Sequence, residues 1–143
     1  MATNRDVRAY VERVMHDELA ILRVLAQYCH TIDDGAFDEF AELWAGDAEF
    51  VLRGTVTRGR DAIRDTIAAM QPLERRGRHL TMNPVVDLDG DTAHVVSDFL
   101  FFGRDPGAPA EGTADLRYLG RYHDDFVRTD AGWQFGRREI EFW

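Results

Sequence analysis

The sequence predicts an α+β domain in which helices come first and an antiparallel sheet follows. Between residues 17 and 32, apolar side chains recur every three or four positions, the spacing of a helix with one buried face. After residue 79, two pairs of long segments rich in β-branched and aromatic residues are each joined by a short turn. Because such a sheet must bury one face, we expect an antiparallel or mixed sheet curved around the N-terminal helices, with a pocket at its open end.

The first predicted helix spans residues 17–32. Asp17 and Glu18 suit the positive end of the helix dipole, and Asp33-Asp34-Gly35 ends the helix because Gly35 can adopt a left-handed conformation. Residues 1–16 precede it as an N-terminal extension, either an extra helix or a partly ordered arm. Residues 17–143 form a single predicted domain.

Two shorter helices and three strand pairs complete the expected order of elements. The apolar spacing predicts helices over residues 37–44 and 61–70. Residues 50–52 and 55–57 flank Gly54 and form either a hairpin or one bent strand. Two clear hairpins follow, over residues 80–88 with 92–102 and over residues 114–127 with 132–142, separated by a surface loop at residues 103–112 that contains two prolines.

The amino-acid composition excludes several kinds of catalytic and binding chemistry. All 17 basic residues are Arg, so there is neither a Schiff-base amine nor a phosphate-binding P-loop lysine. The only Ser is Ser97, in a context that is not a nucleophile elbow. The only Cys is Cys29, which excludes an intrachain disulfide and favours a reducing compartment.

Charge and hydropathy limit the partners. The net charge of −9 and the isoelectric point near 4.9 argue against a nucleic-acid-binding surface. No apolar run is long enough for a membrane helix, and residues 1–13 lack the apolar core of a signal peptide. We therefore expect a soluble, cytoplasmic protein whose partner is a small molecule.

Asp33 and His79 are the first two candidate site residues. Asp33 follows an apolar helix where the chain turns, so it is either a half-buried base or part of a solvated helix stop. His79 opens a strand on which Thr81 and Asn83 share its face, which suggests a cavity wall. The alternative for His79 is a surface histidine at a strand start.

Asp98 and Arg138 are two further candidates. Asp98 lies between Val96 and Leu100 on one strand face, so it is either in the pocket or paired in the core. Apolar residues before and after Gly136 have opposite parity, and a bulge there would turn Arg138 inward and leave its neighbour Arg137 in solvent. A solvated arginine pair is the alternative.

Several motifs together resemble the SnoaL-like branch of the nuclear-transport-factor-2-like superfamily. They are Y-C-H-T-I-D-D-G-A-F-D-E-F-A-E-L-W-A-G-D-A-E-F at residues 28–50, G-R-D-A-I at 59–63, R-H-L-T-M-N-P at 78–84, and G-R-Y-H-D at 120–124 with the later Gly132-Trp133. The resemblance covers about residues 17–142. It implies a cone-shaped α+β barrel and a homodimer formed through the outer sheet face.

The resemblance also implies site residues. In the dehydratase and dehydrochlorinase members an Asp-His pair lies in the cone, and the matching residues here look like Asp33 and His79. Tyr28 would supply a pocket hydroxyl, Arg138 a pocket cation, and Asp98 a polar wall residue. The expected substrate-binding residues are Phe50, Met70, Val96, Asp98, Leu100 and Tyr122.

From these residues we expect a lyase or isomerase that needs no cofactor and no metal and acts on a small apolar or cyclic substrate. His79 would remove a proton from carbon, while Asp33 holds the imidazole and stabilises its charged form. Tyr28 would donate to an oxygen of the substrate, and Arg138 or Asp98 would orient it. The alternatives are an aldol-type polyketide cyclase with the same pocket and a non-catalytic ligand-binding or assembly subunit.

Overall fold

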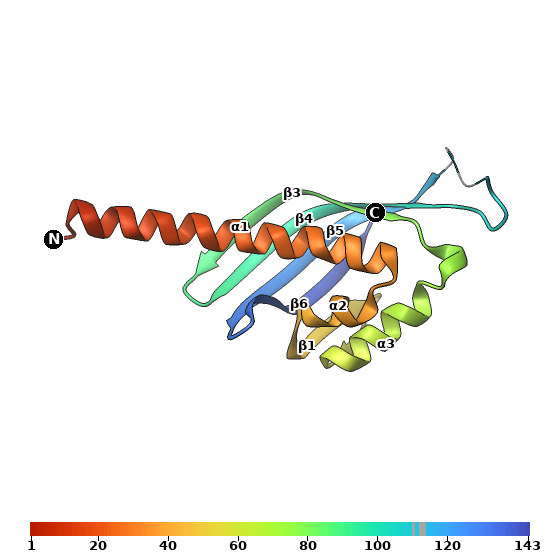
Figure 1. The fold of residues 1–143 in the computed structure, drawn as a ribbon, viewed down its shortest axis with the longest axis horizontal. Helices are drawn as coiled ribbons and strands as arrows, with labels where there is room; N and C mark the ends of the chain where they lie inside the picture. Colours follow the sequence, from red (N-terminus) through yellow and green to blue (C-terminus); the bar gives the residue numbers. More distant parts are fainter. Residues whose placement is uncertain (110, 112–113) are drawn as a thin grey trace.

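A long helix, α1 (Asn4–Asp34), begins the fold and crosses one face of the sheet (Figure 1). The computed structural model describes residues 1–109, 111 and 114–143. Thr3 caps the helix through a capping box with Asp6, and Gly35 ends it at φ +72°. Residues 4–16 are therefore the first turns of the predicted helix. They extend past the sheet, and every side chain before Val14 is exposed.

Two short helices follow the chain reversal at Gly35. They are α2 (Phe37–Glu42), which lies beside the C-terminal end of α1, and α3 (Arg60–Met70), which packs against α2 and β1 (Figure 1). A 3-10 turn at Leu73–Arg75 leads into the sheet. The prediction that Trp44 belongs to the second helix is wrong, because α2 ends at Glu42 and Trp44 starts a strand whose side chains fill the core.

Six strands form one mixed sheet in the order β2-β1-β6-β5-β4-β3. Strands β1 and β6 are parallel, and the other neighbouring strands are antiparallel. The predicted α+β class is confirmed, and residues 50–52 and 55–57 form a hairpin. The strands are β1 (Trp44–Leu52), β2 (Thr55–Arg58), β3 (Arg78–Asp89), β4 (Thr92–Gly103), β5 (Asp115–Thr129) and β6 (Gly132–Phe142).

The core lies between α1 and the sheet, and it is rich in aromatic side chains. Tyr28 of α1 packs against Phe40, Trp44, Tyr122 and Phe135, with ring centroids 5.3–6.4 Å apart. These side chains are at most 2% exposed. Aromatic pairs of this kind add to the stabilisation from burial alone, so they hold α1 firmly on the sheet.

The register of β6 changes at Gly136, as the sequence predicted. Asp125 pairs with Arg137 and the next residue, Phe126, pairs with Phe135, so Gly136 is the extra residue of a bulge. Phe135 and Arg138 consequently both point into the interior, and both are 0% exposed. Among the residues that the structure describes, no helix is long and apolar enough to cross a membrane.

Candidate active site

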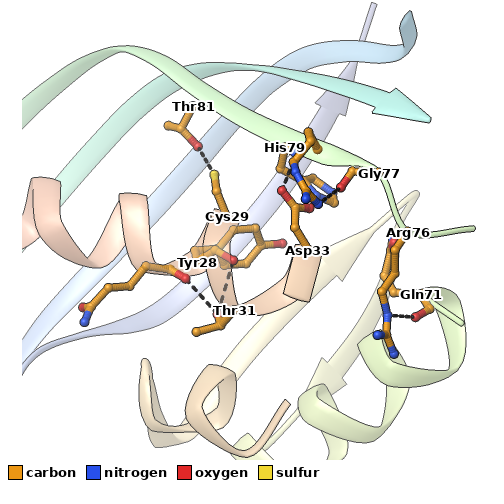
Figure 2. Close-up of polar contacts among 11 residues, drawn as sticks. Tyr28, Cys29, Thr31, Asp33, Gln71, Arg76, Gly77, His79 and Thr81 are labelled. Carbon is orange, nitrogen blue, oxygen red and sulfur yellow. Dashed lines mark hydrogen bonds and ion pairs between the residues drawn. The ribbon is translucent and has the colours of Figure 1, made fainter. Parts of the chain in front are cut away.

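The end of α1 and the start of β3 bring Asp33 and His79 together. Asp33 Oδ1 lies 2.6 Å from His79 Nδ1, and Asp33 Oδ2 accepts a 2.9 Å hydrogen bond from the His79 backbone N–H (Figure 2). The side chains are only 6% and 10% exposed. One carboxylate thus holds both the main chain and the ring of the same residue, which fixes where the imidazole points.

The contact also selects a tautomer of the neutral ring. A carboxylate only accepts hydrogen bonds, so the proton of the imidazole lies on Nδ1, which donates to Asp33. Nε2 is then left with its lone pair and can accept a proton. A carboxylate next to the ring also stabilises the charged imidazolium that proton uptake creates.

His79 lies in the wall of a cavity of about 160 Å³ between the helices and the sheet. An apolar cavity of about 150 Å³ is enough for benzene, so the volume fits one six-membered ring. Phe101 of β4 packs against the imidazole with ring centroids 4.5 Å apart. The wall consists of Tyr28, Ile32, Leu52, Arg53, Ile67, Met70, Gln71, His79, Phe101, Tyr118, Tyr122, Ile140 and Phe142. Four of the expected site residues are among these: Tyr28, Met70, His79 and Tyr122.

A second hollow, of about 240 Å³, reaches His79 from the side between α1 and β3. Cys29 and Thr81 both line it and contact each other, with Sγ and Oγ1 3.4 Å apart (Figure 2). Burial raises the pKa of the Cys29 thiol, so the thiol is protonated at neutral pH. Cys29 therefore packs in this wall as a neutral side chain.

Arg138 lies beneath the cavity and is not in its wall. Its guanidinium is 0% exposed and makes a two-bond ion pair with Asp124, at 2.7 and 2.8 Å. The guanidinium carbon also lies 3.7 Å from the ring centre of Tyr122 and 4.1 Å from that of Tyr28. The expectation that Arg138 contacts the substrate is corrected, because two tyrosine rings stand between its charge and the cavity.

The buried cation has consequences for the tyrosines above it. Burial alone would lower the pKa of Arg138, but the Asp124 carboxylate raises it above its ordinary value, so Arg138 stays charged. Burial raises the pKa of the Tyr28 phenol, and the nearby Arg138 only partly opposes this. Tyr28 is therefore a protonated hydrogen-bond donor at neutral pH.

Three residues of β4 that were expected in the pocket lie on the opposite face of the sheet. The side chains at odd positions of this strand, from Ala93 to Phe101, are the buried ones. Val96, Asp98 and Leu100 consequently point away from the cavity. Asp98 accepts hydrogen bonds there from Asn83 at 3.0 Å and from Arg121 at 2.9 Å.

Two further expectations of position are also corrected. Phe50 packs edge-to-face on Trp44 in the core and is 2% exposed, so it supports the wall without forming it. Asn83 does not share the face of His79, because it has a φ of +52° and lies at a register shift in β3. Its side chain therefore reaches Asp98 on the outer face.

Sequence reasoning missed Arg53, Phe101 and Tyr118 in the cavity wall. Phe101 is paired with His79 across β3 and β4, so a correct choice of the buried face of β4 would have found it. Arg53 lies in a hairpin turn, where periodicity carries no information. Within the described parts of the chain, no three His, Cys, Asp or Glu side chains are grouped so as to hold a metal ion.

Comparison with known proteins agrees with the motifs. Residues 13–139 match the SnoaL-like domain family. The uncharacterised protein Rv2910c of Mycobacterium tuberculosis is 30% identical over 125 residues, which are 85% of this chain and 82% of that protein.

Two solved structures from Novosphingobium aromaticivorans, each 26% identical to this chain, superpose closely on it. One is described as an ntf2-like protein with a cystatin-like fold; it has a TM-score of 0.83 and covers 99% of this chain and 91% of its own. The other is named "Putative Scytalone Dehydratase". It has a TM-score of 0.79, and the match covers 93% of this chain and 88% of that one. The nuclear-transport-factor-2-like fold expected from the motifs is thereby confirmed.

Proposed function

The chain belongs to the SnoaL-like domain family, and we propose that within it the protein is a cofactor-independent lyase or isomerase that removes a proton from carbon. The observation that carries the proposal is the contact of 2.6 Å between Asp33 and the ring of His79, together with the place of that ring in the cavity wall. A fixed imidazole with one free nitrogen can act as a general base.

The proposed dehydration has two steps on a cyclic β-hydroxycarbonyl compound. His79 Nε2 takes the proton from the carbon next to the carbonyl, and the electron pair of that C–H bond moves onto the carbonyl oxygen as an enolate. The enolate then re-forms the carbonyl and a carbon–carbon double bond, while the C–O bond of the hydroxyl breaks. His79 returns its proton to the departing oxygen, which leaves as water.

Tyr28 and Asp33 stabilise the charges that these steps create. Tyr28 lines the cavity and keeps its proton at neutral pH, so it can donate a hydrogen bond to the enolate oxygen. Asp33 faces the imidazolium formed in the first step. Arg138 does not contact the substrate in this proposal. Its guanidinium lies against the rings of Tyr28 and Tyr122 and makes the electrostatic potential beneath them more positive.

The test is a carbon-acid assay on a panel of one-ring β-hydroxy ketones. The protein is incubated with each compound in D₂O, and NMR follows α-proton exchange and alkene formation. We expect at least one compound to exchange or eliminate, and we expect Asp33→Asn to abolish the reaction with little change in melting temperature. The amide that this substitution introduces still accepts the His79 backbone N–H but cannot stabilise an imidazolium.

The matched control is Asp34→Asn, which changes the exposed neighbouring carboxylate. It is expected to react like the wild type. If Asp33→Asn instead loses several degrees of stability and keeps its activity, Asp33 is a structural residue and the mechanism is wrong. An aldol cyclisation would begin with the same proton removal but would form a carbon–carbon bond, which the NMR products distinguish.

A further inference from the structure

The turn between β1 and β2 has an unusual residue at its first position. Leu52 and Thr55 are paired, so Arg53 and Gly54 alone form the loop, with φ angles of +50° and +80°. Two positive φ angles in a two-residue hairpin are typical of a type I′ turn, which favours Asn-Gly. Arginine has a Cβ and is disfavoured in this conformation. An outlier of this kind motivates a search for what its side chain does.

The side chain of Arg53 lies at the mouth of the cavity that contains His79. It is one of the lining residues, and it is also exposed to solvent. Its guanidinium carbon is 4.6 Å from the ring centre of Phe142, another lining residue. A guanidinium stacked on an aromatic ring keeps its N–H donors at its edge, where they can reach a ligand.

The charge of Arg53 is not compensated by a neighbour. Within the described residues no carboxylate lies within 4.0 Å of Arg53, and no side-chain hydrogen bond holds its guanidinium. Arg58, on the other side of the same hairpin, instead pairs with Glu49. In a chain with a net charge of −9, an unpaired arginine at the mouth of an apolar cavity is a local exception that favours an anion there.

We propose that Arg53 binds a carboxylate of the substrate, and that the substrate is a small cyclic compound with a carboxylate outside the ring. The ring would fill the apolar cavity beside His79, while the carboxylate would accept two hydrogen bonds from the edge of the guanidinium. This inference rests on the proposed function in one respect, namely that the cavity is the substrate site. It adds a substrate class to that proposal and does not depend on turnover.

The experiment compares acids with their uncharged amides. Isothermal titration calorimetry at low salt measures the binding of benzoate, phenylacetate and trans-cinnamate, each beside its primary amide. The three acids place the carboxylate at increasing distances from the ring. We expect at least one acid to bind about tenfold more tightly than its amide, which is the effect of a single charge-assisted contact. Arg53→Gln should reduce this preference to less than about twofold.

Arg58→Gln is the matched control, because it removes an exposed cation of the same hairpin that is not a lining residue. It should keep the preference for the acid. Arg53→Asn gives a second readout, since Asn-Gly suits the turn. That variant should melt at or above the temperature of the wild type and still lose the preference, which separates ligand binding from a role in the fold.

The proposal is overturned if no acid of the series is preferred by the wild type, including the case in which none binds. It is also overturned if Arg53→Gln retains the preference or if Arg58→Gln loses it equally. Failure of the proposed function looks different: Arg53 would still discriminate acids from amides, but Asp33→Asn would leave proton exchange unchanged. Conversely, an Asp33-dependent reaction without acid preference would refute only the role of Arg53.

Discussion

Two aspartates of α1 are buried to the same extent but are held in different ways. Asp17 is 9% exposed and Asp33 is 8% exposed. Asp17 accepts two hydrogen bonds of 2.8 Å from Arg128 and one of 3.0 Å from the indole of Trp133. Asp33 accepts both of its bonds from His79, one from the ring and one from the main chain.

The two aspartates differ in what the rest of each partner side chain contacts, Arg128 for Asp17 and His79 for Asp33. Arg128 also lines a surface hollow, but all three nitrogens of its guanidinium are bonded to protein, two to Asp17 and one to Asp91 at 2.9 Å. The Asp17 network therefore joins α1 to two hairpins and leaves no guanidinium nitrogen of Arg128 without a partner. His79 turns its other side to a cavity. Burial of a carboxylate is therefore a poor guide to function, and a partner with an unused face is a better one. The predictions below test this distinction.

The largest expected effect is on the Asp33–His79 pair. His79→Gln should lower kcat/KM by about 10²–10⁴-fold, the usual contribution of a general base. The double variant Asp33→Asn/His79→Gln should be no slower than His79→Gln alone, because the carboxylate acts only through the imidazole. Initial rates of the four proteins on the substrate found by the D₂O screen measure this. Fully additive losses would show that Asp33 acts independently of His79.

Asp17→Asn should have the opposite signature. Removing this charge leaves Arg128 and Trp133 poorly paired, and we expect the free energy of unfolding to fall by about 1–3 kcal/mol. Urea denaturation measures the change, and kcat/KM below the melting transition should stay within about twofold. Asp91→Asn, which removes only an exposed partner of Arg128, should cost less than about 1 kcal/mol. A catalytic loss in Asp17→Asn at full stability would contradict the comparison.

The Asp17 network should also give the stability a pH dependence. The hydrogen bond from Arg128 lowers the pKa of Asp17 below its usual value of 3.8, although partial burial opposes this. The unfolded chain therefore binds this proton first as the pH falls, so the stabilisation is present above about pH 4 and is lost as the pH drops through the lower, folded-state pKa. Melting curves from pH 7 to pH 3 should show the gap between the wild type and Asp17→Asn closing below about pH 4. A constant gap would contradict the assignment.

The smallest effect is expected for Asp98, a third paired carboxylate. It lies on the outer face of β4, where Asn83 and Arg121 lower its pKa by hydrogen bonding. Asp98→Asn should leave kcat/KM within about twofold and leave the melting temperature nearly unchanged. Rates and melting curves of the purified variant check this. A large loss of activity would contradict this prediction and show that Asp98 contributes to catalysis.

The sequence carried strong information wherever periodicity and chemistry pointed the same way. The α+β class, the hairpins and the bulge at Gly136 could be predicted, because turn residues and a change of parity are local signals. Asp33 and His79 needed the family resemblance as well, since the contact joins residues 46 positions apart.

Other features were hidden for physical reasons. Strand β4 has apolar residues on both faces, at Val95 beside Val96 and at Phe99 beside Leu100, so alternation could not choose the buried face. The spacing of apolar residues from Phe37 to Trp44 fits a helix, but Trp44 is the first residue of β1 and its side chain is buried in the core. Arg53 has a positive φ, which arginine rarely adopts, so the local sequence does not predict this turn. It also does not predict that the Arg53 side chain lines the cavity.

The bulge at Gly136 also determines how β6 responds to insertions and deletions as opposed to substitutions. Replacing a residue of this strand alters one side chain. Deleting Gly136 would remove the extra residue of the bulge, so Arg137 would still pair with Asp125 and Arg138 with Asp124, and both would keep their faces. Inserting one residue between Arg137 and Arg138 would instead turn Arg138 and every later residue of the strand to the other face, and Arg138 would lose its place beneath Tyr28 and Tyr122. We therefore expect β6 to tolerate the loss of this one residue and not the gain of another.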